Sequence, residues 1–199
     1  LTELYLVSTQ IADTGLKEVA ELTNLEILTL SNTKITDAGL RDLGKLRKLK
    51  ELSLNHNQIT DTGLKEVAKL PRLTDLNLGS TKITGVGLKD LVKLKSLEGL
   101  DLRSTQITDT GVKDLVELKE LEGLNLGSTK ITDTGLKDVA KMHQLKWLDL
   151  SNTQTTYVGL KELVKIQGLE MLTAFGSKIT VTEVFELRKA LPNCSIVIP

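Results

Sequence analysis

Residues 25–48 read LEILTLSNTKITDAGLRDLGKLRK, and the same arrangement of residues recurs along the chain at an interval of 24. Leucine opens every unit, at positions 1, 25, 49, 73, 97, 121, 145 and 169, with no insertion between units. Eight units cover residues 1–192 and leave the short segment 193–199. A fixed period of about 20–50 residues is typical of solenoids, in which each unit is one small piece of secondary structure. The repeat therefore predicts a solenoid.

Each unit contains the pattern of a strand followed by that of a short helix. Leu28 and Leu30 alternate with other residues, which is the period of a strand that buries one face. Leu40, Leu43 and Leu46 are spaced three residues apart and form one stripe of a short helix. We therefore expect every unit to fold as strand, tight turn, short helix and turn.

Polar residues and glycine hold fixed places around these two elements. Thr36 and Asp37 precede the helical stripe and are suited to the N-cap and the first helical turn. Acids pair with bases three residues later on the outer face, as in Asp42 with Lys45. The ninth position of every unit is Thr, Asn or Ser, which can hydrogen-bond the backbone where the chain leaves the strand. Seven units have glycine at position 15, so we expect neighbouring units to approach too closely there for a side chain.

One unit cannot bury its own leucines, so neighbouring units must stack side by side. Stacked strands lie about 4.8 Å apart, whereas stacked helices need about 8–10 Å. The helical side is therefore longer, and the stack must bend with its sheet on the inside. The predicted fold class is α/β, a curved horseshoe-shaped solenoid with a parallel β-sheet on the concave side and short α-helices on the convex side.

The pattern resembles leucine-rich repeats of the helix-backed, ribonuclease-inhibitor-like type. The 24-residue length and the Thr-Asp-x-Gly-Leu segment are similar to the bacterial GALA-type subclass, and the resemblance covers the whole chain in register. It implies a horseshoe whose concave sheet binds other proteins. GALA effectors carry an F-box ahead of their repeats. This chain has none, so the resemblance does not extend to a role in a ubiquitin ligase.

The two ends of the chain differ. At the C-terminal end, residues 180–183 have capping-box spacing. Ile196 and Ile198 fall at the inward positions of a ninth strand, which Pro199 would stop. We therefore expect one leucine-rich-repeat domain over residues 1–199, with eight repeats in 1–192 and a capping strand in 193–199.

The N-terminal end shows no comparable cap. Leu4, Leu6 and Ile11 would be exposed on the first face, whereas terminal repeats normally need a polar cover. We expect the chain to be a fragment of a larger protein, unless this face pairs with something else. No targeting or membrane-spanning segment is visible, which in a fragment leaves both a cytoplasmic and a secreted bacterial location open.

Composition narrows the possible functions. Lys plus Arg and Asp plus Glu each number 26, and this neutral balance argues against binding to nucleic acid, which needs a surplus of bases. Cys194 is the single cysteine, so no internal disulfide or multi-cysteine zinc site is expected. His56 and His143 should lie on different sides of the solenoid, and no catalytic set is suggested. We expect no cofactor, no metal and no enzymatic activity.

Strand residues that point away from the core fall at repeat positions 3, 5 and 7, and they vary while the leucines do not. Trp147 and Met171 are neighbours on adjacent strands, with Phe175 nearby. Glycines 99, 123 and 127 should leave a shallow hollow beside them, and Arg103 stands next to it. Aromatic residues and arginine beside a recess are typical of binding hot spots. A structural alternative is that the three large apolar residues cover the weakly filled C-terminal end, where Ala174 replaces a core leucine.

The outward sheet positions are also acidic. Repeat positions 2, 3, 5 and 7 hold nine acids against three bases, which favours a basic partner unless the face is merely solvated. The predicted binding residues are Trp147, Met171, Phe175, Arg103, Asp101, Asp149, Asn125, Asp75 and Glu51.

The sequence thus predicts a non-enzymatic recognition module that binds a protein or peptide, basic in character, on its concave sheet. Neither nucleic acid nor membrane insertion is expected. The alternative is a structural or regulatory repeat segment of a larger multidomain protein. Such a segment would dock, for example onto an upstream domain of the same chain, through its N-terminal face or its convex helices.

Overall fold

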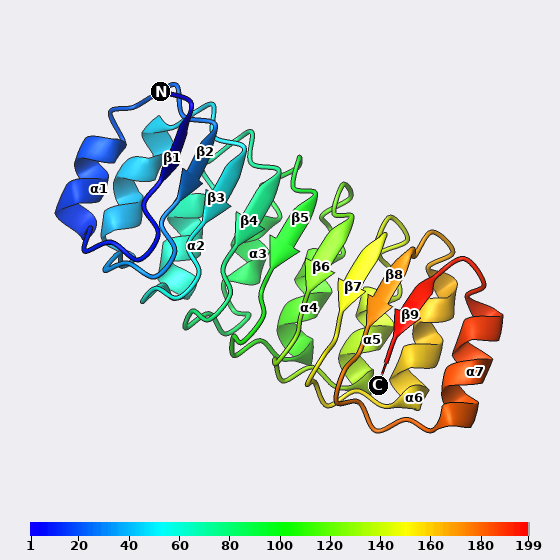
Figure 1. The fold of residues 1–199 in the computed structure, drawn as a ribbon. Helices are drawn as coiled ribbons and strands as arrows, with labels where there is room; N and C mark the ends of the chain where they lie inside the picture. Colours follow the sequence, from blue (N-terminus) through cyan, green and yellow to red (C-terminus); the bar gives the residue numbers. More distant parts are fainter. Residues whose placement is uncertain (199) are drawn as a thin grey trace.

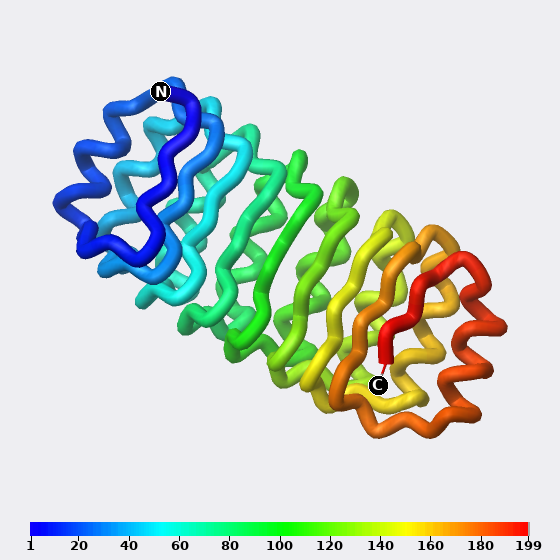
Figure 2. Tube along the Cα trace, in the orientation of Figure 1, coloured from blue at the N-terminus to red at the C-terminus, as the bar shows by residue number. Residues whose placement is uncertain are grey.

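The computed structural model describes residues 1–198, which form one layer of parallel strands backed by one layer of helices (Figure 1). The strands follow chain order across a single sheet. Each strand pairs with the next at a shift of one repeat, so Leu4 lies beside Leu28 and Leu28 beside Leu52. The two chain ends lie at opposite ends of the solenoid (Figure 2). The predicted solenoid with one parallel sheet is confirmed.

The strands are short and occupy the same place in every repeat. They are β1 (Glu3–Tyr5), β2 (Ile27–Thr29), β3 (Glu51–Ser53), β4 (Asp75–Asn77), β5 (Gly99–Asp101), β6 (Gly123–Asn125), β7 (Trp147–Asp149), β8 (Met171–Thr173) and β9 (Ser195–Val197).

The helices are less uniform than the strands. They are α1 (Asp13–Val19), η1 (Gly39–Lys45), α2 (Asp61–Val67), α3 (Leu88–Leu91), α4 (Asp109–Leu115), α5 (Asp133–Val139), α6 (Tyr157–Leu160), η2 (Lys161–Lys165) and α7 (Val181–Ala190), of which η1 and η2 are 3₁₀ helices. The second repeat holds two glycines within η1. Glycine weakens an α-helix by about 1 kcal/mol relative to alanine, so these glycines disfavour a regular α-helix in this repeat.

The core lies between the two layers and consists of the repeated aliphatic residues. Leu28, Leu30, Ile35, Leu40 and Leu43 of the second repeat have no solvent exposure. Burial of each such side chain contributes about 1.5–3 kcal/mol. Because every repeat places the same set in the same register, the leucines form one continuous core along the solenoid.

Aspartate side chains connect neighbouring repeats on the helical side. The Asp37 carboxylate accepts the backbone N–H of Thr60 at 2.9 Å and its hydroxyl at 2.6 Å. The same bridge joins Asp13 to Thr36, Asp61 to Thr84, Asp109 to Thr132 and Asp133 to Thr156. From the sequence, these aspartates were expected only in the first helical turn. Their second role, across the repeat boundary, is a finding of the structure.

The glycine at position 15 makes room for this bridge. A Cβ atom added to Gly63 would lie 2.5 Å from the Asp37 carboxylate, and one added to Gly135 would lie equally close to Asp109. Such separations are shorter than a real Cβ contact, so a side chain at this position would displace the aspartate. The predicted close approach of neighbouring units is confirmed, and its cause is the bridging carboxylate.

The turn after each strand has a fixed geometry. The residue at position 8 is left-handed in every repeat, with φ between 53° and 58° for the seven non-glycine residues and 74° at Gly176. The next residue then hydrogen-bonds the carbonyl oxygen three residues before it, as in Thr33 to Leu30 at 2.9 Å and Thr105 to Leu102 at 2.6 Å. The predicted role of the ninth position is confirmed.

The terminal repeats depart from the pattern in different ways. Leu4, Leu6 and Ile11 were expected to be exposed, and this was wrong. They are half-buried, because each packs against the aliphatic core that continues from the second repeat.

At the C-terminal end, the predicted capping box is present. The Thr180 hydroxyl accepts the Glu183 N–H, and the Glu183 carboxylate accepts the Thr180 N–H. Strand β9 pairs with β8, and Ile196 is buried on it. Pro199, which was expected to stop this strand, lies outside the described residues. Within residues 1–198, no helix is both long and apolar enough to cross a membrane.

Candidate binding face

The sheet face contains an open hollow of about 450 Å³ that crosses strands β2 to β7. Its floor is formed by the inner parts of these strands, including Gly99 and Gly123, and its rim by polar and aromatic side chains. The hollow is thus shared by six neighbouring strands of the sheet. We call this feature the central hollow.

Trp147 stands at one end of the central hollow. It is half-buried on β7 and lies beside Gly123 of β6 in the parallel register. A Cβ atom at Gly123 would lie 3.7 Å from Cε3 of the Trp147 ring, so the indole extends towards the bare glycine backbone. The structure thus brings together Trp147 and two of the glycines that the sequence analysis placed at a recess.

Two carboxylates line the part of the hollow that lies over β3 to β5. Asp75 is exposed, and its Oδ1 would be 2.5 Å from a Cβ atom at Gly99, so the carboxylate lies over the gap left by that glycine. Its other oxygen accepts a hydrogen bond from the Thr74 hydroxyl at 2.9 Å. Glu51, on the preceding strand, also lines the hollow and is exposed.

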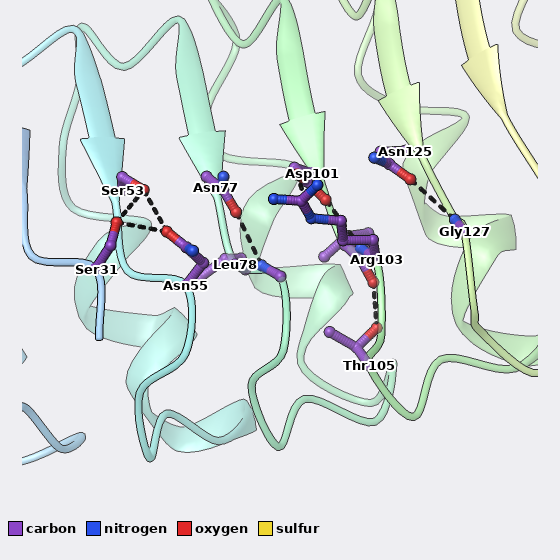
Figure 3. A network of polar contacts seen from close by, with 12 residues as sticks. Ser31, Ser53, Asn55, Asn77, Leu78, Asp101, Arg103, Thr105, Asn125 and Gly127 are labelled. Carbon is purple, nitrogen blue, oxygen red and sulfur yellow. Dashed lines mark hydrogen bonds and ion pairs between the residues drawn. The ribbon is translucent and has the colours of Figure 1, made fainter. Parts of the chain in front are cut away.

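Arg103 does not belong to the central hollow. Its Nε lies 3.3 Å from Oδ2 of Asp101, and its Cγ would lie 3.0 Å from a Cβ atom at Gly79 (Figure 3). The side chain therefore covers Gly79 and binds a neighbouring acid of its own strand. Gly127, which was expected to form the recess together with Gly99 and Gly123, does not line the central hollow.

Four residues at repeat position 5 close the turn after their strand, and three of them (Asp101, Asn125 and Asp149) are among the predicted binding residues. Asn77, Asp101, Asn125 and Asp149 each accept, through Oδ1, the backbone N–H two residues later, at 2.8–3.0 Å. Figure 3 shows these contacts for the first three. Asn125 is only 7% exposed. Its side chain closes a turn and leaves little surface for a partner, and its role as a binding residue stays a prediction.

Met171 and Phe175 lie outside the central hollow, towards the C-terminal end. Met171 pairs with Trp147 across β7 and β8, as expected. Met171 is 40% and Phe175 45% exposed, so neither is sequestered as a cover of the core. Ala174, between Phe175 and the core, is fully buried. These two side chains extend the apolar surface beyond Trp147 but do not share its recess.

A polar network at the ends of β2 and β3 was not predicted from the sequence. The Ser31 and Ser53 hydroxyls lie 3.0 Å apart, and the Asn55 side-chain oxygen accepts from both at 2.5 and 2.7 Å (Figure 3). Ile27 and Thr29, on β2, close the hollow at the end opposite Trp147. The only available signal was that these residues occupy outward positions, which does not distinguish a rim from open surface.

Ion pairs concentrate the charge of the sheet side on a few carboxylates. Lys50 binds Glu26 and Lys146 binds Glu122, both at 2.7 Å, and Arg103 binds Asp101. The Lys50 ammonium holds the pKa of the Glu26 carboxyl below its usual range. All three bases are therefore neutralised. Within residues 1–198, the acids of this side without an ion pair are Glu3, Glu51, Asp75, Glu98, Asp149 and Glu170.

Asp101 provides a pH test of this face. Burial raises the pKa of its carboxyl, and the nearby Arg103 only partly opposes that effect. Because the folded pKa exceeds the unfolded value of about 3.9, ionisation of Asp101 costs stability as the pH rises through that window. Asp101→Asn keeps the turn-closing oxygen, as Asn77 does. The variant should be more stable than wild type at pH 7 by less than about 1 kcal/mol, allowing for the lost exposed ion pair.

Urea denaturation at several pH values checks this expectation. Near pH 3 both side chains are neutral, so the difference in the free energy of unfolding should disappear. A variant that is less stable than wild type at pH 7 would show that the ion pair with Arg103 outweighs the cost of burial.

The helical side has the opposite charge pattern. Lysines at repeat position 21 pair with the acid three residues before them, as predicted, for example Lys141 with Asp138 at 2.6 Å. Bases at position 17 are all exposed and make no ion pair within the described chain. They are Lys17, Arg41, Lys65, Lys89, Lys113, Lys137 and Lys161. Lys161 instead lies 5.5 Å from the centre of the Tyr157 ring.

Residues that commonly support catalysis or metal binding are dispersed. His56 lies in the turn after β3, with a left-handed φ of 58°, whereas His143 lies at the far end of its repeat, near the Lys165 carbonyl oxygen. Burial raises the pKa of the Cys194 thiol. Residues 1–198 contain no group of three or more His, Cys, Asp and Glu side chains arranged to hold a metal ion.

A hollowed sheet face with variable side chains, presented by an invariant aliphatic scaffold, defines a solenoid repeat protein of the kind that binds other molecules. A family model described as leucine rich repeat matches residues 1–59, 48–107 and 95–154. The chain therefore belongs to the leucine-rich repeat family. This fold generally serves as a protein–protein interaction module.

Solved bacterial structures share the fold. Internalin C2 from Listeria monocytogenes is 28% identical, with a TM-score of 0.75 over 94% of this chain and 84% of that chain. An internalin (inlF) from the same species is 24% identical, with a TM-score of 0.72 over 99% of this chain and 60% of that one. A leucine-rich repeat protein from Leptospira interrogans is 23% identical, with a TM-score of 0.58 over 98% and 66%. No curated protein matches. The GALA-type subclass stays a prediction.

Proposed function

We propose that this chain is a non-enzymatic recognition module that binds a basic protein or peptide on its sheet face. The observation that carries the proposal is the central hollow, which combines an aromatic side chain with carboxylates that have no cation of their own. Aromatic residues beside a recess contribute much of the affinity of protein interfaces. The six carboxylates without ion pairs would speed association with a positively charged partner and select against acidic ones.

The sheet face is also preorganised for binding. Binding costs little reorganisation here, because the strands are held by parallel pairing on both sides and the turns are closed by side-chain hydrogen bonds. A preorganised surface loses less conformational entropy on binding than a flexible one. The outward positions can therefore be adapted to a partner without cost to the leucine core.

The test is a selection of peptides from a random phage-displayed library on the immobilised chain, followed by affinity measurements on variants. Enriched peptides should carry net positive charge and bind more weakly as salt concentration rises. Trp147→Ala should weaken them at least about tenfold. The matched control is the double variant Lys113→Glu/Lys137→Glu on the opposite side, which should bind equally well.

The reverse pattern would reject the proposal. Peptides that tolerate Trp147→Ala but lose affinity for Lys113→Glu/Lys137→Glu would assign binding to the convex helices. The row of unpaired bases at repeat position 17 is the specific observation that favours this second candidate. In that case the chain would act as a structural or regulatory segment that docks through its helices onto an acidic surface.

A further inference from the structure

Two glycines create a gap in the middle of the sheet face. At repeat position 3 the strands β5 and β6 carry Gly99 and Gly123, which lie side by side in the parallel register. Their flanking strands carry large side chains at the same position, Asp75 on β4 and Trp147 on β7. The gap is therefore bare backbone, bordered by a carboxylate on one side and an indole on the other.

Both bordering side chains reach into the gap. The Asp75 carboxylate occupies the space over Gly99, and the Trp147 ring extends towards Gly123. The strands that carry them are three strand spacings apart, about 14 Å between backbones. With both side chains leaning inwards, the space between the carboxylate and the indole is narrower than this backbone separation.

The carboxylate is chemically available. Oδ1 of Asp75 has no hydrogen-bond donor within residues 1–198, whereas Oδ2 is held by Thr74. Asp101 lines the same hollow, but its oxygens already receive the backbone N–H and the guanidinium of Arg103. Glu51 adds a second exposed carboxylate on the side of the hollow away from Trp147.

From this arrangement we infer that the central hollow holds an arginine side chain of the partner. This inference rests on the proposed function and specifies it further. The guanidinium stacks on the Trp147 face and donates hydrogen bonds to Asp75. Arginine fits better than lysine because its planar, weakly hydrated fork can stack on an aromatic ring and pair with a carboxylate at the same time. The Arg103–Asp101 pair shows a guanidinium held by a carboxylate on this side of the chain.

Trp147 is the only tryptophan of the chain, so its fluorescence reports directly on the hollow. The probe is the blocked peptide Gly-Gly-Arg-Gly-Gly at low ionic strength. It is compared with peptides that carry lysine or the neutral isostere citrulline in place of arginine. The arginine peptide should change the emission saturably, the lysine peptide should bind more weakly, and citrulline should lower the affinity at least about tenfold.

Three variants distinguish binding at a specific site from general electrostatic attraction to the acidic face. Asp75→Asn is isosteric at an exposed position and should weaken the arginine peptide about fivefold. Glu170→Gln removes an equal charge from outside the hollow and should change the affinity less than about twofold. Gly123→Ala places a methyl group at ordinary van der Waals distance from Trp147, so it should fold normally while it narrows the hollow and weakens binding.

Each of three results would overturn the inference: equal binding of the citrulline and arginine peptides, equal losses for Asp75→Asn and Glu170→Gln, or an unchanged Trp147 emission. The proposed function fails on a different measurement. Library peptides that depend on Trp147 but lack arginine would support binding at the sheet face and reject arginine as the occupant.

Discussion

Gly159→Ala is expected to lower the free energy of unfolding by about 3 kcal/mol. The added Cβ atom would lie 2.8 Å from the Asp133 Cα and closer still to the Asp133 carboxylate. The backbone of the preceding repeat cannot yield as a flexible side chain could. Moving it would also break the bridge from Asp133 to Thr156, which holds the two repeats together. Urea denaturation followed by far-UV circular dichroism measures the loss.

Gly44→Ala is the matched control. Gly44 lies within η1, and an added Cβ atom would meet no other atom closer than 3.9 Å. Alanine favours a helix over glycine by about 1 kcal/mol, so this variant should be as stable as wild type or more stable. If both variants lost stability equally, the cost at Gly159 would reflect the backbone preferences of glycine and not the contact with Asp133.

Thr132→Ala should lower the free energy of unfolding by about 2 kcal/mol. Its hydroxyl donates to the Asp109 carboxylate at 2.6 Å and accepts the Thr134 N–H at the start of α5. Removal leaves a partly buried charge with one donor fewer and an uncapped helix. Both effects destabilise the folded state, and the second alone is worth about 1 kcal/mol.

The chain supplies its own control for this bridge. In the fourth repeat Gly85 replaces the aspartate, and the Thr108 hydroxyl meets only that of Thr110, at 3.0 Å. Thr108→Ala should therefore cost less than about 1 kcal/mol. The Thr108 hydroxyl also makes no N-cap hydrogen bond, so similar losses for the two variants, measured under the same conditions, would show that the aspartate bridge and the cap of Thr132 contribute little.

Much of the fold follows from the repeat because the physical requirement is local and identical in every unit. The strand can bury Leu28 and the helix can bury Leu40 only when both elements stack against the same elements of the next unit. The single aliphatic core and the parallel register confirm this. The exposure expected for Leu4 was wrong, because even an end repeat buries one side against its neighbour.

The candidate site was only partly predictable. Trp147 and the glycines of β5 and β6 were expected beside a recess, and they line the central hollow. Arg103 was expected there too, but it turns towards Gly79 and Asp101. Asn125 was predicted to bind a partner, and its side chain closes a turn. The direction and occupation of a side chain depend on its neighbours in space, which the spacing of residues does not contain.

The order of residues alone was sufficient to establish the architecture. A period of 24 residues with invariant leucines allows one way to remove them from water, so the solenoid and its register follow from hydrophobic burial. Only the tertiary structure showed the hydrogen bonds between repeats and the directions of the side chains on the sheet face. Whether Asp37 reaches Thr60, or Asp75 lies over Gly99, depends on distances of a few ångströms between residues some 24 positions apart. Directional hydrogen bonds and charges are set at that range, whereas burial of leucine requires only the correct face.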